Sequence, residues 1–206
     1  MKKVLLLMIL SIGLIFCLAP NTNAGFNFGI RYLSLTAQCP PGLGFHLGAD
    51  LGENAVILGG LELLRESSKK ELTGAGPYSY KDESATTVFT PFFGGKYYFK
   101  SRSSGEVSFY ISALFFKSFA SVNIDTGDPD ADKYDEELYK ELASPFGFNP
   151  AFGAEYYFSD YFAIGGETGL KFSSAKAEVK SGSTTYEESH SSIDHYFSIT
   201  LNFRVK

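Results

Sequence analysis

The residues that could carry out hydrolysis gather near the C-terminus. His190 and Ser192 are two positions apart, with Glu187 and Glu188 close by. Residues at this spacing lie on one face of a β-strand, so the histidine could act as the base and the serine as the nucleophile of a hydrolase. The stretch is rich in Ser and Thr, however, where such triplets arise by chance. We therefore predict no enzyme and keep a hydrolase as the alternative.

A run of carboxylates in the middle of the chain is spaced like a calcium loop. Asp128, Asp130 and Asp132 occupy alternate positions, as calcium ligands do in such loops. The glycine that should follow is replaced by Lys133, and the position of the bidentate glutamate holds Tyr139. We therefore predict a solvated acidic loop without a metal or cofactor, with calcium as the weaker alternative.

Other charges occur singly within apolar segments, always on the face opposite the apolar residues. His46 shares this face. An unpaired buried charge is strongly unfavourable, so we expect the four cations and four carboxylates of this set to pair. The set is Arg31, Asp50, Glu62, Lys96, Glu155, Glu167, Lys171 and Arg204.

The segments that hold these charges alternate with period two, which indicates β-strands. Residues 89–99 and 148–158 repeat one pattern, FTPFFGGKYYF and FNPAFGAEYYF. One face of each copy is aromatic or small, and the other is polar with Lys96 or Glu155. A soluble sheet would bury the aromatic face, whereas a membrane barrel turns it outward to lipid and keeps the polar face in its lumen.

We expect eight strands with alternating short and long connections. The short connections are 52–54, 100–105 and 159–160, and the long polar ones are 66–84, 118–146 and 173–193. The first connection, near residues 36–42, is of modest length, and a short helix is expected at 135–143. The strands are expected at residues 26–35, 43–51, 55–65, 89–99, 106–117, 148–158, 161–172 and 196–205.

The N-terminus has the features of a secretory signal peptide at residues 1–24. Lys2 and Lys3 precede an apolar run, and small residues precede the expected cut after Ala24. An uncleaved anchor helix is the alternative. Cleavage leaves one domain at 25–206, in which Cys39 is the single cysteine and no intrachain disulfide can form. The net charge of −5 gives no indication of nucleic-acid binding.

These features resemble the small eight-stranded outer-membrane β-barrel family of the OmpA-barrel and OmpX type. The resemblance covers the whole mature chain and rests on the signal peptide, the eight-strand pattern, the aromatic segment ends at 97–99 and 156–158, and the aromatic-rich last strand. It departs from the family where Arg204, Val205 and Lys206 follow Phe203, since such chains often end on an aromatic residue. It implies an all-β, up-and-down transmembrane barrel in the bacterial outer membrane, monomeric, with long loops outside the cell.

The resemblance also implies a structural or surface-interaction role, of the adhesion or defence type, through the external loops. The expected partners are outer-membrane lipid and lipopolysaccharide, and an external ligand or host surface. Arg65 and Lys117 are candidate lipopolysaccharide contacts, with strand-end snorkelling as the alternative. Eight strands leave interior room only for side chains, which argues against a porin. A small-molecule transporter or narrow channel, a lipid A-modifying barrel enzyme and a soluble lipocalin-like periplasmic binder are the alternatives.

Overall fold

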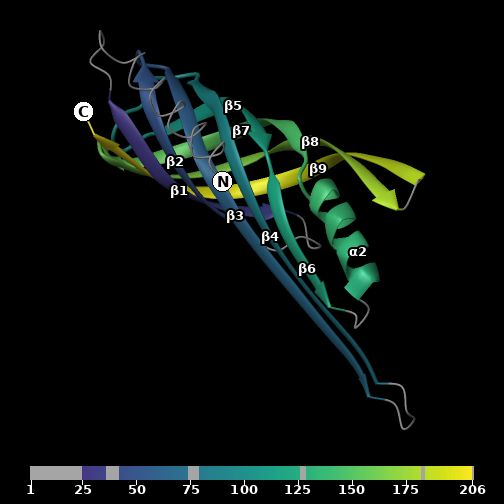
Figure 1. Cartoon of the computed structure of the whole chain (residues 1–206). Helices are drawn as coiled ribbons and strands as arrows, with labels where there is room; N and C mark the ends of the chain where they lie inside the picture. The colour runs from purple at the N-terminus through teal and green to yellow at the C-terminus, as the bar shows by residue number, and fades with distance from the viewer. Residues whose placement is uncertain (1–24, 36–41, 74–78, 126–128, 182–183, 206) are drawn as a thin grey trace.

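In the computed structural model the chain forms a closed ring of antiparallel strands. The structure describes residues 25–35, 42–73, 79–125, 129–181 and 184–205. Successive ring positions pair with each other, and β1 pairs with β9 to close the ring (Figure 1). In chain order the elements are β1 (Phe26–Leu35), β2 (Gly42–Leu51), β3 (Ala55–Thr73), β4 (Ser79–Tyr98), β5 (Val107–Lys117), β6 (Phe119–Asp125), α2 (Pro129–Leu142), β7 (Phe146–Ser159), β8 (Phe162–Ser181) and β9 (Thr184–Val205).

Strands β5 and β6 share one ring position and are separated at Ser118. β4 pairs with both of them without a shift of register. Pro91 lies at the break, and proline has no N–H to donate to a ladder. The equivalent Pro150 of the second repeat lies where the pairing of β7 with β8 is interrupted, between Phe148 and Ala151. The ring therefore has eight positions, and the predicted eight-stranded antiparallel barrel is confirmed.

The register of the ring sets the tilt of the strands. Cross-strand partners of Phe115 lead through Phe148 and Phe172 to Ile193 on β9. The cross-strand partners of Phe115 in the other direction around the ring lie on β4, β3, β2 and β1. They lead to Phe203 on β9, which is ten residues after Ile193. A fixed stagger of this kind closes a tilted sheet into a barrel, and at eight strands side chains fill the interior.

The two ends of the barrel differ in the length of their connections. At the short-turn end, residues 52–54, 99–106 and 160–161 join the strands. Gly52 and Gly105 have φ of 76° and 79°, which glycine adopts without strain. At the opposite, long-loop end, the β3–β4 and β8–β9 hairpins project beyond the ring, and α2 lies on the same side (Figure 1).

The strands at the long-loop end are longer than the apolar alternation predicts. Residues 66–84 and 173–193, predicted as polar connections, are largely paired extensions of β3 with β4 and of β8 with β9. Backbone hydrogen bonds join these extensions, and in β8 Ala175 and Ala177 form a buried face beyond the predicted end of the strand. In the connection predicted at 118–146, β6 continues the β5 position and α2 begins at Pro129, earlier than the helix predicted at 135–143.

Helix α2 packs where the ring is incomplete at the long-loop end. β7 begins only at Phe146, so β6 and β8 extend past it, and α2 contacts both. The Ile124 N–H donates to Glu136 Oε1 and the Ala120 N–H to Ser144 Oγ, each at 2.9 Å. The helix region thereby satisfies backbone donors at the edge of β6 that would otherwise remain open.

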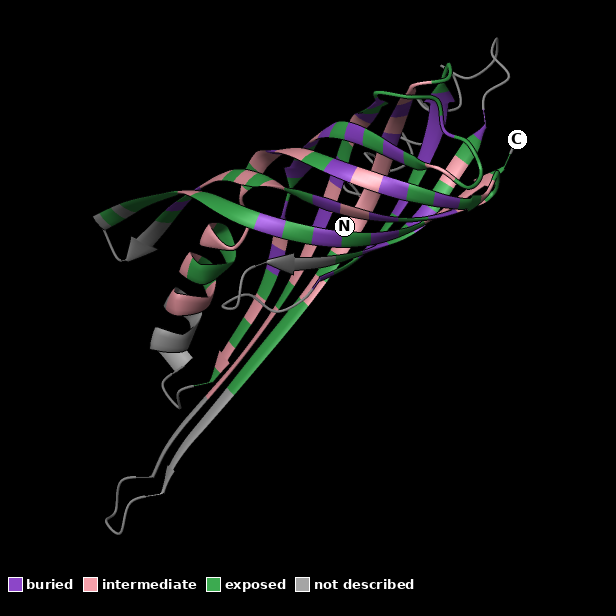
Figure 2. Ribbon diagram, turned by 180° about the vertical axis from the view of Figure 1, so that it is seen from behind, coloured by how far each residue is buried: buried purple, intermediate pink, exposed green. Residues whose placement is uncertain are grey.

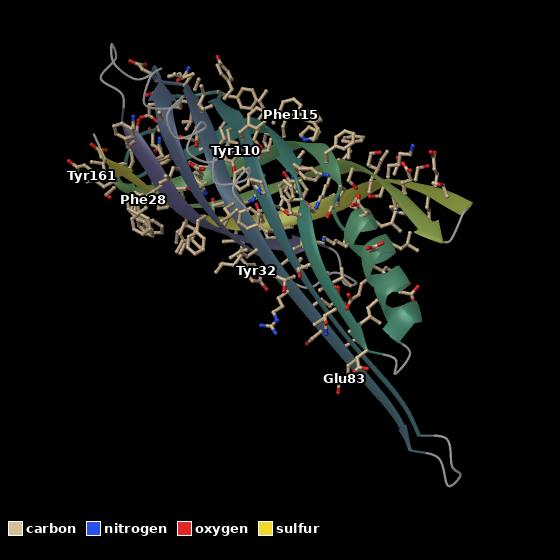
Figure 3. All side chains as sticks on the ribbon, in the orientation of Figure 1. Phe28, Tyr32, Glu83, Tyr110, Phe115 and Tyr161 are labelled. Atoms are coloured by element: carbon tan, nitrogen blue, oxygen red, sulfur yellow. The ribbon has the colours of Figure 1, made fainter. Side chains whose placement is uncertain are left out.

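Alternate residues of each strand point into the barrel and away from it, as the stripes of Figure 2 show. Phe115 projects outward and is 49% exposed, whereas Tyr110 on the same strand is fully buried (Figure 3). No helix within the described ranges is both long and apolar enough to span a membrane. At the short-turn end, consecutive ring contacts with centroids 4.8 to 5.6 Å apart link Tyr156, Phe158, Phe162, Phe203 and Phe28 on the outer surface.

Candidate functional site: the charged lumen

The interior of the barrel holds three clusters of charged side chains. Each cluster centres on one buried carboxylate, that of Asp50, Glu155 or Glu167. The eight charges that the sequence assigns to the inner face are buried or half-buried here: Arg31, Asp50, Glu62, Lys96, Glu155, Glu167, Lys171 and Arg204.

Glu155 accepts four hydrogen bonds. Lys96 Nζ and Asn202 Nδ2 donate to Oε1 at 2.7 and 3.0 Å. The hydroxyls of Tyr98 and Tyr157 donate to Oε2 at 2.9 and 2.6 Å. Because Glu155 is only 1% exposed, these four donors take the place of the water that would otherwise solvate the carboxylate.

The two sequence repeats supply this ion pair, since Lys96 on β4 and Glu155 on β7 occupy equivalent positions. β5 runs between the two strands, and its inward-facing Ser108 and Ser112 are small. Their size leaves room for the lysine to reach the carboxylate across β5. Lys96 Nζ also lies 4.3 Å from the centroid of the Tyr110 ring, in a cation–π contact.

The second cluster joins Glu167 to β1 and β9. Arg31 Nη2 and the Tyr196 hydroxyl donate to Glu167 Oε1 at 2.7 and 3.0 Å, and Ser112 Oγ donates to Oε2 at 2.7 Å. Arg31 Nη1 lies 3.7 Å from Glu62 Oε1. The arginine thus bridges two carboxylates on different strands.

The third cluster closes the short-turn end. Arg204 donates to Asp50 Oδ2 from Nε at 2.9 Å and from Nη2 at 2.6 Å. Arg102 Nη1 and Asn27 Nδ2 donate to Oδ1 at 3.0 and 2.6 Å. The Arg102 guanidinium lies 4.8 Å from the centroid of the Tyr98 ring, so the turn between β4 and β5 sends a side chain back into the lumen.

Arg102 is a lumen cation that sequence reasoning misses. It lies in a short turn, where a charge is ordinarily solvated and no periodicity assigns an inward direction. Burial alone would lower the pKa of Arg102, but the neighbouring Asp50 carboxylate outweighs it, and the pKa is raised. The guanidinium therefore stays charged opposite Asp50.

Two inward residues have partners other than a carboxylate. Lys171 Nζ lies 4.8 Å from the centroid of the Phe116 ring, and it forms no ion pair with any residue that the structure describes. His46 Nε2 is 2.8 Å from Asn202 Oδ1, which links it to the Glu155 cluster. Of the four cations that we expected to pair, Lys96 and Arg31 pair with Glu155 and Glu167 and Arg204 with Asp50, whereas Lys171 instead contacts the Phe116 ring.

These side chains fill the lumen. Two small interior cavities lined by described residues have volumes of about 10 Å³ each, which is room for about one water molecule. Neither of these two cavities is large enough for a small-molecule ligand.

The candidate lipopolysaccharide contacts lie on the outer surface. Arg65 on β3 and Lys117 on β5 are both exposed toward the long-loop end. Lys117 Nζ donates to the carbonyl of Ser144 and lies 5.9 Å from the centroid of the Phe119 ring. The two cations lie on ring positions that are separated by β4.

The hydrolase candidate does not assemble into a nucleophile and base. Ser192 Oγ donates to Asp194 Oδ2 at 2.7 Å and lies 2.7 Å from Ser173 Oγ. His190 is exposed on the β9 extension, and no hydrogen bond between His190 and Ser192 occurs among the described contacts. Nucleophilic activation would need that contact.

The calcium candidate is only partly described, because Asp128 lies outside the described residues. Cys39 and residues 1–24 lie outside them too. Asp130 and Asp132 lie in the first turn of α2. Within the described part of the chain, no group of three or more His, Cys, Asp or Glu side chains could hold a metal ion.

No protein-family model matches the sequence, and no curated protein matches it either. The solved structures that the chain resembles include outer membrane protein W of E. coli, with 15% identity, a TM-score of 0.46 and coverage of 88% of this chain and 97% of that one. A major outer membrane protein of Thermus thermophilus has 12% identity and a TM-score of 0.45, with coverage of 88% and 99%. The N-terminal β-barrel domain of OprF from Pseudomonas aeruginosa has 10% identity and a TM-score of 0.39, with coverage of 87% and 97%. Such likeness is limited to general architecture, and the barrel fold implied by the sequence resemblance is confirmed by the closed ring of strands itself.

Proposed function

We propose that this chain is an integral outer-membrane β-barrel with a closed lumen, and that it acts as a structural or surface-interaction protein through its long-loop end. The observation that carries the proposal is the distribution of apolar and charged side chains, which is the reverse of that in soluble proteins. Large apolar side chains cover the outer surface of the ring, while buried positions hold paired charges. Apolar surface left in water costs about 25 cal/mol per Å², whereas a bilayer accepts an outward apolar face and a polar interior.

The proposed orientation places the short-turn end in the periplasm and the long-loop end outside the cell. Short periplasmic turns and long external loops are usual for such barrels. The projecting hairpins and α2 then form the external surface, and a host surface or an external ligand is the expected partner. The signal peptide proposed at residues 1–24 supports export to this location. We expect a monomer.

The arrangement argues against the alternatives. A soluble lipocalin-like binder needs an apolar interior with space for a ligand, and a wide channel needs an open lumen. A lipid A-modifying enzyme needs an assembled nucleophile and base at the outer leaflet, and His190 and Ser192 do not form that pair. The filled, charged lumen leaves the exterior surface as the place for interaction.

Membrane insertion is tested by sodium carbonate extraction of membranes from cells that express the full chain. The barrel should remain in the membrane pellet, dissolve only with detergent, and migrate differently on gels before and after boiling. Its release into the soluble fraction by carbonate would overturn the proposal.

The surface role is tested by shortening each projecting hairpin separately. Replacing residues 66–84 with a tight turn removes the β3–β4 extension, and replacing residues 177–188 with a tight turn shortens the β8–β9 extension. Cell adhesion, serum resistance and permeability to small dyes are read in parallel. A surface role predicts altered adhesion or serum resistance with unchanged permeability. Increased permeability alone would instead indicate a transport role.

A further inference from the structure

A groove of about 540 Å³ opens on the outer surface near the long-loop end of the apolar band. It spans β5, β7, β8 and β9, and it is distinct from the interior cavities. Its apolar lining consists of Phe115, Phe146, Phe148, Phe172 and Ile193. All five lie on the outer face, and Phe115 can be seen projecting from the barrel in Figure 3.

The boundary between apolar and polar surface crosses this groove. One row of cross-strand partners is wholly apolar and consists of Phe115, Phe148, Phe172 and Ile193. The next row toward the long-loop end carries an ammonium group and two hydroxyls, and consists of Lys117, Phe146, Ser174 and Ser191. The groove therefore has a hydrocarbon floor with the hydroxyls of Ser174 and Ser191 at its mouth, and Lys117 lies beside it, as the cross-strand partner of Phe146.

We propose that this groove seats one acyl chain of a lipopolysaccharide molecule, with a sugar phosphate of its headgroup at the Lys117 ammonium. The inference rests on the proposed membrane insertion, because the groove is continuous with the lipid-facing band. The long-loop end places it in the outer leaflet, where lipopolysaccharide resides. An ammonium beside a phosphate forms a strong, charge-assisted hydrogen bond.

Charges of both signs lie near the groove, since α2 contacts β8 and carries the exposed carboxylates of Glu137 and Glu141 as well as Lys140. Lys176, the next outward residue of β8 beyond Ser174, pairs with Glu187 at 3.0 Å, so that carboxylate is already neutralised. Lys117 is exposed, and its contact within the protein is to the neutral carbonyl of Ser144. Its charge remains available to a phosphate.

The first test compares Lys117→Gln with Arg65→Gln. Both cations are exposed on the outer surface toward the long-loop end, but Arg65 lies on β3, away from the groove. The barrel is extracted from outer membranes in mild detergent, and the bound lipopolysaccharide per barrel is counted by native mass spectrometry. Lys117→Gln should reduce occupancy by roughly three- to tenfold, equivalent to about 0.7–1.4 kcal/mol, and Arg65→Gln should leave it unchanged.

The second test fills the groove. Ser174→Phe places a ring at its mouth, and Ser121→Phe makes the same change at an exposed position of β6 outside the groove. Only Ser174→Phe should displace the acyl chain and lower occupancy. Folding of each variant is checked by its gel mobility before boiling, and if Ser174→Phe does not fold, the Lys117→Gln comparison still decides.

The class of lipid that binds is tested by titrating the delipidated barrel with lipopolysaccharide or with phosphatidylglycerol. The proposal expects saturable binding of one lipopolysaccharide at a concentration at which phosphatidylglycerol does not bind. Equal binding of the two lipids, or equal occupancy in Lys117→Gln and Arg65→Gln, would overturn it. A barrel that carbonate releases from membranes would refute membrane insertion instead, so the two failures are distinguishable.

Discussion

Replacing Lys96 and Glu155 tests whether paired charges hold the lumen together. Lys96→Met leaves Glu155 with its three neutral donors. Glu155→Met leaves the Lys96 ammonium, which is 7% exposed, with the Tyr110 ring as its remaining described contact. Removal of one partner from a buried pair costs about 3–5 kcal/mol. We expect the free energy of unfolding to fall by about 3 kcal/mol for Lys96→Met and about 5 kcal/mol for Glu155→Met.

The double variant should be milder than the sum of the single variants. It leaves no unpaired buried charge, although Tyr98 and Tyr157 lose an acceptor at about 1–3 kcal/mol each. We expect a total loss of about 3–5 kcal/mol. The coupling between the two sites should therefore be about 3–5 kcal/mol, at or above the upper end of the range of about 0.5–3 kcal/mol found for residues in direct contact.

The assay is urea unfolding of the refolded barrel in detergent. The folded fraction is measured by gel mobility without boiling, because the chain has no tryptophan to report unfolding by fluorescence. Lys100 and Glu106 supply a matched control, since the same residue types pair at 2.6 Å but are 65% and 43% exposed. Their coupling should be only about 0.2–1 kcal/mol. Additivity within about 0.5 kcal/mol at the buried pair would refute the reasoning.

Three further predictions concern the Asp50 cluster, the topology and the acidic loop. Asp50→Asn should lower the urea midpoint more than Arg102→Met. Asp50→Asn removes the counterion of both Arg102 and Arg204, whereas Arg102→Met leaves Asp50 with Arg204 and Asn27. The reverse order would mean that Asp50 is not the centre of this cluster. Protease added to intact cells should cut within 123–144 and spare 52–54 and 100–105, and the opposite pattern would invert the orientation. Millimolar calcium should leave the cutting at 123–144 unchanged, and protection by calcium would contradict the solvated-loop interpretation.

The strands of the barrel could be predicted because two different environments act on alternate residues. β1 occupies Phe26–Leu35, as predicted, and β2 differs from its prediction by one residue. Beyond the ring this constraint ends. Both faces of the β3–β4 extension carry polar residues, so period two disappears there although the backbone remains paired. In the extension of β8, the buried Ala175 and Ala177 still alternate with the exposed Lys176 and Glu178, so period two continues past the predicted end of that strand, but with small rather than large apolar residues.

The sequence contains features of a helix start at Pro129, but the same residues also fit a calcium loop. Pro129 stands at the first position of the helix, where proline is favoured, and carboxylates follow in the first turn, where the helix dipole favours them. The same residues also fit the alternate spacing of calcium ligands. Arg102 carries no comparable signal, because its inward direction depends on the conformation of a turn.

The two repeats explain why pattern predicts the outside of this barrel better than its inside. Equivalent outward positions hold the same residue type, such as Phe93 with Phe152 and Tyr97 with Tyr156. In the proposed setting a bilayer surrounds every strand alike, so both copies meet the same requirement. The inward positions of Lys96 and Glu155 instead carry opposite charges, because each must find its counterion within the lumen. Which charges meet depends on the stagger of the strands and on the small residues of β5, and these are properties of the closed ring rather than of either repeat.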